Sequence, residues 1–136
     1  MDGRSLPDIG RGLAAGSTEA HWRSRVGRAY YALLHEVLGA LGRWSFALPP
    51  RDKVHTFARL KLVYATDPDL KRIGLTLESV GRLRNVADYL IGSSGPFVAP
   101  TIAISALNDA EFAIALLDAI EADPARRAGA ARTIPP

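Results

Sequence analysis

The sequence predicts an all-α fold, an antiparallel bundle of four to five helices. Apolar residues recur every three or four positions along most of the 136-residue chain, which is the spacing of one helix face. No stretch alternates apolar and polar residues for long, so strands are not expected. Short connections with proline or glycine separate the helical segments, and short connections favour antiparallel neighbours.

The first long helix is expected to run from Glu19 to about Gly42. Ser17 or Thr18 can cap it, and the Glu19 carboxylate suits the positive end of the helix dipole. Gly42 is a natural stop, because glycine readily adopts the left-handed conformation that ends many helices. Local residue types therefore predict both boundaries of this helix.

Two further helices are expected across breaks that contain proline. The second covers residues 51–65, after a pair of prolines. The third starts at Asp67-Pro68, because aspartate is a good helix cap and proline is favoured at the first helical position. Residues 92–96 end this helix. One face of it holds Leu70, Ile73, Leu77, Val80, Arg84, Ala87 and Ile91.

The last long helix is expected over about residues 100–121, and two terminal segments flank the bundle of residues 17–122. Residues 1–16 form an N-terminal segment, in which residues 4–15 can add a short helix. Residues 123–136 are expected to be a disordered basic tail, since they hold three arginines against one aspartate and end in two prolines. The inner side of the last helix is predicted to hold Ala103, Ala106, Leu107, Ala110, Ile114, Leu117 and Ile120.

Composition excludes several classes of protein. The chain has no cysteine, so disulfides, thiolate metal sites and cysteine nucleophiles are ruled out. Its three histidines never adopt paired ligand spacing and no glycine-rich phosphate loop is present, so neither a metal nor a cofactor is expected. No apolar run reaches the roughly 18 residues of a membrane span. Residues 1–16 lack the apolar block of a signal peptide, and we expect a cytoplasmic protein without membrane association.

The charge of the chain gives a weak indication of its partners. The net charge is +3, from 17 basic and 14 acidic residues. Residues 1–61 carry 10 basic and 5 acidic side chains, so the front half of the chain is basic. Such a surface suits a polyanion, although a solvated helical face is the more common explanation.

Two polar groups interrupt the apolar faces. On the third helix, Arg84 and Asp88 share a face because they are four residues apart, and Asn85 and Tyr89 lie one step round. A buried polar group without a partner costs about 1–3 kcal/mol. The residues are therefore either a structural network that fixes helix packing or a functional site, and the sequence leaves both open. The second group lies on one face of the first helix and consists of Arg28, Tyr31, Ala32 and His35.

Together, two segments of the chain resemble the HEPN superfamily, in particular its small stand-alone prokaryotic members. The run from Ser24 to His35 matches a first helix of the form YYA-x-x-H, and Leu83 to Tyr89 matches a third helix of the form R-x-x-A-D-Y. His55 falls where such proteins often place a histidine at the start of the second helix, although a lone helical histidine is more often a core residue. The resemblance covers about residues 18–121.

The resemblance implies a helical bundle that forms a homodimer and, in many members, cleaves RNA without a metal ion. Such proteins act in toxin–antitoxin or defence systems, and they often occur beside a nucleotidyltransferase-type partner. Their catalytic motif is an arginine followed, one or two turns later, by a histidine. Arg84 and Asn85 match the start of this motif, but Asp88 and Tyr89 stand where the histidine is expected.

These observations give a set of candidate site residues. A histidine suits proton transfer because its pKa lies near neutrality, and an arginine suits phosphate because its planar fork stays charged. His35 is the candidate for the missing imidazole, on the expectation that it points inward with Arg84. The catalytic candidates are Arg84, Asn85, Asp88 and His35, and the binding candidates are Arg25, Arg28, Tyr31 and Tyr89, of which both tyrosines are also candidates for modification.

Two other functions stay open at this point. One is a non-catalytic module that binds RNA, a nucleotide or another protein, paired with a nucleotidyltransferase-type partner. The other is a purely structural helical dimer without a ligand. The resemblance thus predicts the fold more firmly than it predicts the activity.

Overall fold

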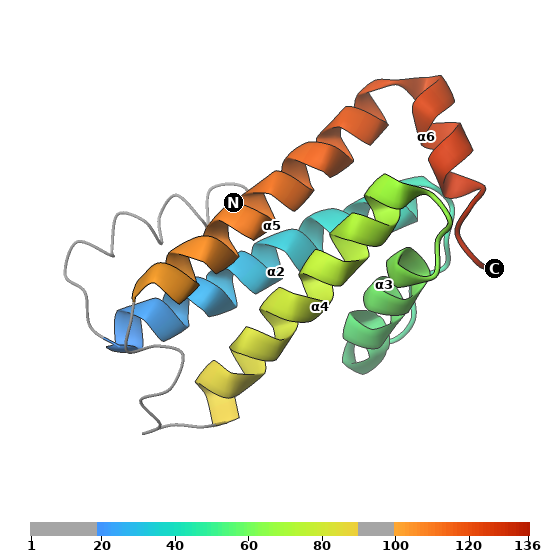
Figure 1. Cartoon of the computed structure of the whole chain (residues 1–136). Coiled ribbons are helices and arrows are strands. Elements are labelled where there is room, and N and C mark those ends of the chain that lie inside the picture. The colour runs from blue at the N-terminus through green and yellow to red at the C-terminus, as the bar shows by residue number, and fades with distance from the viewer. Residues whose placement is uncertain (1–18, 90–99) are drawn as a thin grey trace.

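A computed structural model of the chain describes residues 19–89 and 100–136 (Figure 1). Every regular element within these ranges is a helix, which confirms the prediction of an all-α bundle. The short helix expected over residues 4–15 lies outside the described residues. The elements are α2 (Glu19–Arg43), the short 3₁₀ helix η2 (Arg51–Lys53), α3 (Val54–Val63), α4 (Pro68–Tyr89), α5 (Pro100–Ala122) and α6 (Pro124–Ala131).

Three long helices form the body of the molecule. Helices α2, α4 and α5 pack against one another, and α4 runs in the opposite direction to the other two (Figure 1). The short helix α3 packs on α4 and contacts α2, whereas α6 packs on α5. This arrangement leaves α3 on one side of the bundle, next to α4.

The core is built from the helix faces that the sequence predicts. All seven predicted inner residues of α5 are buried, as are the four apolar residues from Leu70 to Val80 on α4. The largest fully buried side chains include Leu33 on α2, Leu62 on α3 and Leu107 on α5. The described helices therefore share one apolar core.

Helix α2 ends close to the predicted position, but a different residue adopts the left-handed conformation that follows it. The left-handed residue is Ser45, with φ of 72°, and not Gly42. The Phe46 amide donates to the Leu41 carbonyl at 3.0 Å, and the Ser45 amide donates to the Gly42 carbonyl at 3.1 Å. These two bonds close the last turn in the pattern expected around a left-handed residue after a helix.

A close approach between α3 and α4 depends on Gly74. A Cβ atom on Gly74 would lie 2.7 Å from the backbone nitrogen of Val63 and 2.8 Å from the Cβ atom of Leu62. Only glycine leaves room for this contact, since real Cβ atoms do not approach other atoms so closely. The contact fixes the end of α3 against the first half of α4, and the start of α3 therefore lies beside the second half of α4.

Residues 123–136 form an ordered C-terminal segment, so the expectation of a disordered tail is wrong. The Asp123 side chain caps α6 by accepting a hydrogen bond from the Ala125 amide at 3.0 Å. Ala130 and Ile134 are buried in the core. The composition of the tail could not reveal this, because its order depends on residues far away in the sequence.

Arg126 ties α6 to the start of α4 through two carboxylates, and we call Asp67, Asp69 and Arg126 the Asp67 network. The guanidinium donates to both carboxylate oxygens of Asp67 and, at 2.9 Å, to Asp69. Asp67 also accepts hydrogen bonds from the amides of Asp69 and Leu70, at 3.0 and 3.1 Å. The cap predicted from Asp67-Pro68 is thus confirmed, and it carries a long-range ion pair as well.

Candidate functional site

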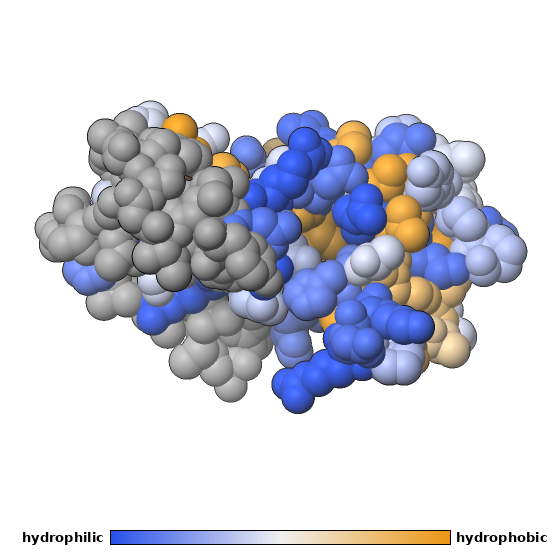
Figure 2. All heavy atoms as spheres, turned by 90° about the horizontal axis from the view of Figure 1, so that it is seen from below, coloured by the Kyte–Doolittle hydropathy of each residue, from blue (hydrophilic) through white to orange (hydrophobic). Residues whose placement is uncertain are grey.

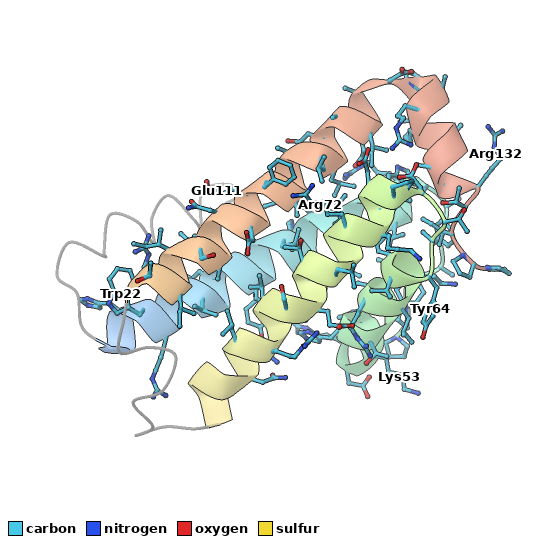
Figure 3. All side chains as sticks on the ribbon, viewed as in Figure 1. Trp22, Lys53, Tyr64, Arg72, Glu111 and Arg132 are labelled. Atoms are coloured by element: carbon cyan, nitrogen blue, oxygen red, sulfur yellow. The ribbon has the colours of Figure 1, made fainter. Side chains whose placement is uncertain are left out.

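A cleft of about 440 Å³ opens between α3 and α4, with Tyr30 of α2 also contributing to its lining. Lys53 and Tyr64 mark the two ends of α3 beside it (Figure 3). The view from below shows many strongly hydrophilic side chains next to smaller apolar patches (Figure 2). The cleft is lined by Tyr30, His55, Thr56, Arg59, Leu77, Glu78, Gly81, Arg82, Arg84 and Asn85.

The polar lining follows from the spacing of residues on the two helices. On α3, His55 and Arg59 are four residues apart and share a face. On α4, Glu78, Arg82 and Asn85 recur at four and three residues and also share a face. Because α3 and α4 lie side by side, the two polar faces meet above the core. The lining contains three arginines and one glutamate, which suits an anionic ligand.

His55 is held by Tyr30 within this cleft. The Tyr30 hydroxyl lies 2.7 Å from Nδ1 of His55, and the two rings are nearly parallel, with an angle of 3° between their planes. Gly81 makes room for the tyrosine, since a Cβ atom there would lie 3.0 Å from Tyr30 Cε1. The imidazole is therefore oriented by the Tyr30 hydroxyl at its Nδ1 atom.

The surroundings keep both members of this pair uncharged at neutral pH. Burial lowers the pKa of His55, and the positive charge of Arg84 lowers that pKa further. Burial also raises the pKa of Tyr30, although Arg84 acts in the opposite direction. When Nδ1–H donates to the tyrosine oxygen, Nε2 carries a lone pair and is a base. A neutral imidazole is what proton abstraction requires.

Arg84 lies near the rings of Tyr30 and Tyr31 and donates hydrogen bonds to Tyr31 and Asn85. Its Nη1 donates to the Tyr31 hydroxyl at 2.7 Å, and its Nη2 donates to Oδ1 of Asn85 at 2.9 Å. Its guanidinium carbon lies 5.0 Å from the ring centre of Tyr30 and 5.4 Å from that of Tyr31. Arg84 and His55 line the same cleft, and the positive charge of Arg84 acts on the imidazole.

The same cleft also holds a shared carboxylate. Glu78 accepts a hydrogen bond from Arg59 of α3 at 3.4 Å and another from Arg82 of α4. One carboxylate thus faces two guanidiniums that come from different helices. The positive charge of the cleft is only partly balanced by this contact.

The structure brings several of the sequence candidates together. Arg84 contacts both Asn85 and Tyr31, and its bond to Tyr31 joins the first and third predicted helices. Asp88 and Tyr89 belong to the last turn of α4, but their side chains lie outside the described residues. Their predicted roles stay predictions.

His35 does not point inward, so the placement on which its catalytic role depended is wrong. Its side chain is exposed, and it does not line the cleft. His35 lies one turn after Tyr31, which is itself 47% exposed although it contacts Arg84. His55 takes the place beside Tyr30 and Arg84. The sequence signal for it was its position at the start of the second helix, with Arg59 one turn later.

Arg25 was predicted to extend the positive surface, and this is also wrong. Its side chain is buried, at 3% exposure, and its guanidinium lies over the ring of Trp22 at 4.8 Å. Arg28 is half-buried and does not line the cleft. The cationic groups of the cleft come from Arg59 and Arg82 instead, which sequence reasoning missed because each resembles an ordinary exposed helical arginine.

No family model, curated protein or solved structure matched this chain in the three comparisons. Among the described helices, none is long and apolar enough to cross a membrane. Within the same residues, no group of three or more histidine and carboxylate side chains is placed to hold a metal ion. We therefore infer function from the cleft itself.

Proposed function

We propose that this chain is a HEPN-type, RNA-directed protein whose cleft binds the RNA backbone and cleaves it without a metal ion. One observation supports the proposal above all: the imidazole of His55 and the guanidinium of Arg84 line the same cleft, together with two further arginines. A neutral imidazole can accept a proton, and a guanidinium can bind a phosphate through two parallel hydrogen bonds.

Each group has a defined part in the proposed reaction. Nε2 of His55 accepts the proton of the ribose 2′-hydroxyl, and the 2′ oxygen forms a new bond to the adjacent phosphorus. Arg84 stabilises the added negative charge on the phosphorane. The bond from phosphorus to the 5′ oxygen then breaks, and water supplies the proton of that leaving oxygen. The products are a 2′,3′-cyclic phosphate and a 5′-hydroxyl end.

This assignment accounts for the departure from the HEPN motif. In the family pattern the arginine and the histidine lie on the same helix, whereas here Arg84 is on α4 and His55 is on α3. The imidazole reaches the cleft from the neighbouring helix. Formation of a homodimer through the faces of α2 and α4, and a toxin–antitoxin or defence role in the cytoplasm, belong to the same proposal.

The second candidate is a non-catalytic module that binds RNA or a nucleotide and pairs with a nucleotidyltransferase-type partner. Asp88 and Tyr89 in place of the motif histidine favour it. In that case Arg84 would hold a phosphate, and the bond between Tyr30 and His55 would serve only to position α3.

The decisive experiment is RNA cleavage by the purified protein in the presence of EDTA. We expect single-stranded RNA to be cleaved to a cyclic phosphate. His55→Ala should slow cleavage by about 100-fold or more, because a positioned base typically contributes 10²–10⁴-fold. Arg84→Ala should slow it by a similar factor, because loss of one donor to a developing negative charge costs about 10²–10³-fold. His35→Ala is the matched control and should cleave normally, since His35 lies outside the cleft.

The outcomes separate the two candidates. Binding that depends on Arg84 without any cleavage would favour the non-catalytic module. Cleavage that is unchanged in His55→Ala would contradict the role of the imidazole. Thermal unfolding of each variant, followed by circular dichroism, shows whether a loss of activity reflects a loss of fold.

A further inference from the structure

We infer that the cleft contains a second phosphate subsite, formed by Arg59 and Arg82, which Glu78 fills when no ligand is bound. This inference rests on the proposed function and extends it, because it defines the length of RNA backbone that the cleft holds. The first subsite is that of Arg84 and His55.

The geometry of Glu78 resembles that of a bound anion. Its two carboxylate oxygens are divided between the two arginines, with Oε2 facing Arg59 and Oε1 facing Arg82. A phosphate presents several oxygens of the same kind and can accept from both guanidiniums in the same way. The two arginines come from different helices, α3 and α4, so an anion between them also joins the walls of the cleft.

The ion pairs of Glu78 are open enough to be exchanged. The Arg82 side chain is 70% exposed, that of Arg59 is 40% exposed, and that of Glu78 is 27% exposed. Ion pairs at such exposure contribute little to stability. A phosphate that enters the cleft can therefore displace Glu78, which is free to turn towards solvent.

The two subsites are close to each other. The positive charges of Arg84 and Arg59 both act on the Tyr30 hydroxyl, where they oppose the larger effect of burial on its pKa. The Arg84 guanidinium carbon lies 5.0 Å from the ring centre of Tyr30, and Arg59 lines the same cleft as Tyr30 and Arg84. Because His55 lies at the Arg84 subsite, the phosphate to be cleaved belongs there and its neighbour belongs between Arg59 and Arg82.

This placement defines the ligand class. The cleft is suited to an oligonucleotide with at least two neighbouring phosphates. A ligand with a single phosphate occupies only one of the two subsites. Glu78 then lowers the affinity for RNA, since it competes with the second phosphate. It is an internal competitor and not a catalytic residue.

The test compares two glutamates that each pair with an arginine. Glu78→Gln removes the competing charge from the cleft, whereas Glu121→Gln removes the same charge from the pair that Glu121 forms with Arg43 at 3.0 Å, between α5 and α2. The probe is a fluorescent single-stranded RNA oligonucleotide, and the measurement is its anisotropy in EDTA. We expect Glu78→Gln to bind about three- to tenfold more tightly than Glu121→Gln, as the weakness of exposed ion pairs implies.

Salt dependence provides an independent measurement of the same subsite. The slope of log K against log salt concentration changes by about 0.7 for each phosphate contact with single-stranded RNA. Alanine at both Arg59 and Arg82 should reduce the steepness by about that amount, as should Arg84→Ala alone. For a dinucleotide with one phosphate, the double variant should bind like the unaltered protein.

The outcomes distinguish this inference from the proposed function. If Arg84→Ala weakens binding but Glu78→Gln is no tighter than Glu121→Gln, the second subsite is wrong and the proposed function stands. If both Glu78→Gln and Glu78→Ala bind RNA more weakly, Glu78 positions the arginines, and the inference that it competes with phosphate is wrong. Absence of RNA binding by the unaltered protein would overturn both proposals.

Discussion

The two halves of α4 each hold a group of arginines and carboxylates, and the two groups are built differently. At the start of the helix, the two carboxylates of Asp67 and Asp69 surround one arginine, Arg126. In the second half, one carboxylate, Glu78, faces two arginines, and Arg84 lies in the same cleft. Both groups consist of carboxylates and arginines. Carboxylates outnumber the arginine in the first group, whereas arginines outnumber the carboxylate in the second.

The main carboxylates of the two groups, Asp67 and Glu78, also differ in how exposed they are to solvent. The Asp67 side chain is 11% exposed and also accepts hydrogen bonds from backbone amides. Glu78 is more exposed and has only side-chain partners among its recorded hydrogen bonds. A shielded carboxylate with backbone partners, such as Asp67, stabilises the fold, whereas an excess of partly exposed cations is suited to a ligand. The predictions below test whether stability and binding are separated in this way.

The largest effect is expected from Gly74→Ala, which acts on both halves at once. The new methyl group would overlap the backbone at Val63, and backbone cannot move as easily as a flexible side chain. Overpacking typically costs about 1–3 kcal/mol, and we expect a loss of about 3 kcal/mol in the free energy of unfolding. Urea unfolding measures the loss, and RNA binding should fall with it because α3 shifts away from α4.

Gly27→Ala is the matched control for Gly74→Ala. Gly27 lies in the middle of α2, and a Cβ atom there would meet nothing within 4 Å. Alanine is favoured over glycine in a helix by roughly 0.5–1 kcal/mol, so this variant should be slightly more stable. Equal destabilisation by the two substitutions would mean that the close contact of α3 with α4 does not fix the cleft.

The next effect is expected from Asp67→Ala, which removes the cap of α4 and the main partner of Arg126. Loss of a cap costs about 0.5–2 kcal/mol, and the lost ion pair adds to it, so we expect about 2 kcal/mol. The midpoint of urea unfolding measures this loss, and RNA affinity should remain close to that of the unaltered protein.

The companion variant Glu78→Ala should show the reverse pattern. Its ion pairs are exposed, so its effect on the free energy of unfolding should stay below about 0.5 kcal/mol, while RNA binding tightens. A larger loss of stability from Glu78→Ala than from Asp67→Ala would contradict the assignment of the two groups to binding and to stability.

The smallest effects are expected in the pH dependence of stability, where the two groups act in different ranges. Hydrogen bonds from Arg126 lower the pKa of Asp67 in the folded protein. The unfolded chain therefore binds more protons there, and the stability from this group is present above the ordinary pKa of about 3.9. It is lost as the pH falls through the lower folded pKa. Asp67→Asn should remove this loss of stability at acid pH.

His55 should act at higher pH. Burial and Arg84 lower its pKa, so its stabilising contribution is present above the ordinary value of about 6.5 and is lost as the pH falls towards the folded pKa. Urea unfolding between about pH 7 and pH 5 should therefore show a decline that His55→Gln flattens. A decline that persists in His55→Gln would place another group in that range.

Local patterns in the sequence determined the helices and their buried faces. The inner residues of α5 and the cap at Asp67-Pro68 were predicted because a helix face repeats every three or four residues and a cap acts within one turn. The contact of Tyr31 with Arg84 was suggested by two shared polar faces, since each face could be identified from its own helix. Such features depend only on neighbours along the chain.

Tertiary structure decided which partners those faces meet. Tyr30 and His55 are 25 positions apart, Tyr31 and Arg84 are 53 apart, and Arg126 and Asp67 are 59 apart. Both His35 and His55 fit a helix equally well, and only the packing of α3 on α4, permitted by Gly74, brings His55 into the cleft. The order of residues 123–136 likewise depends on burial of Ile134 and on Asp67. Side-chain spacing thus determined the helices, and the crossing of the helices determined the site.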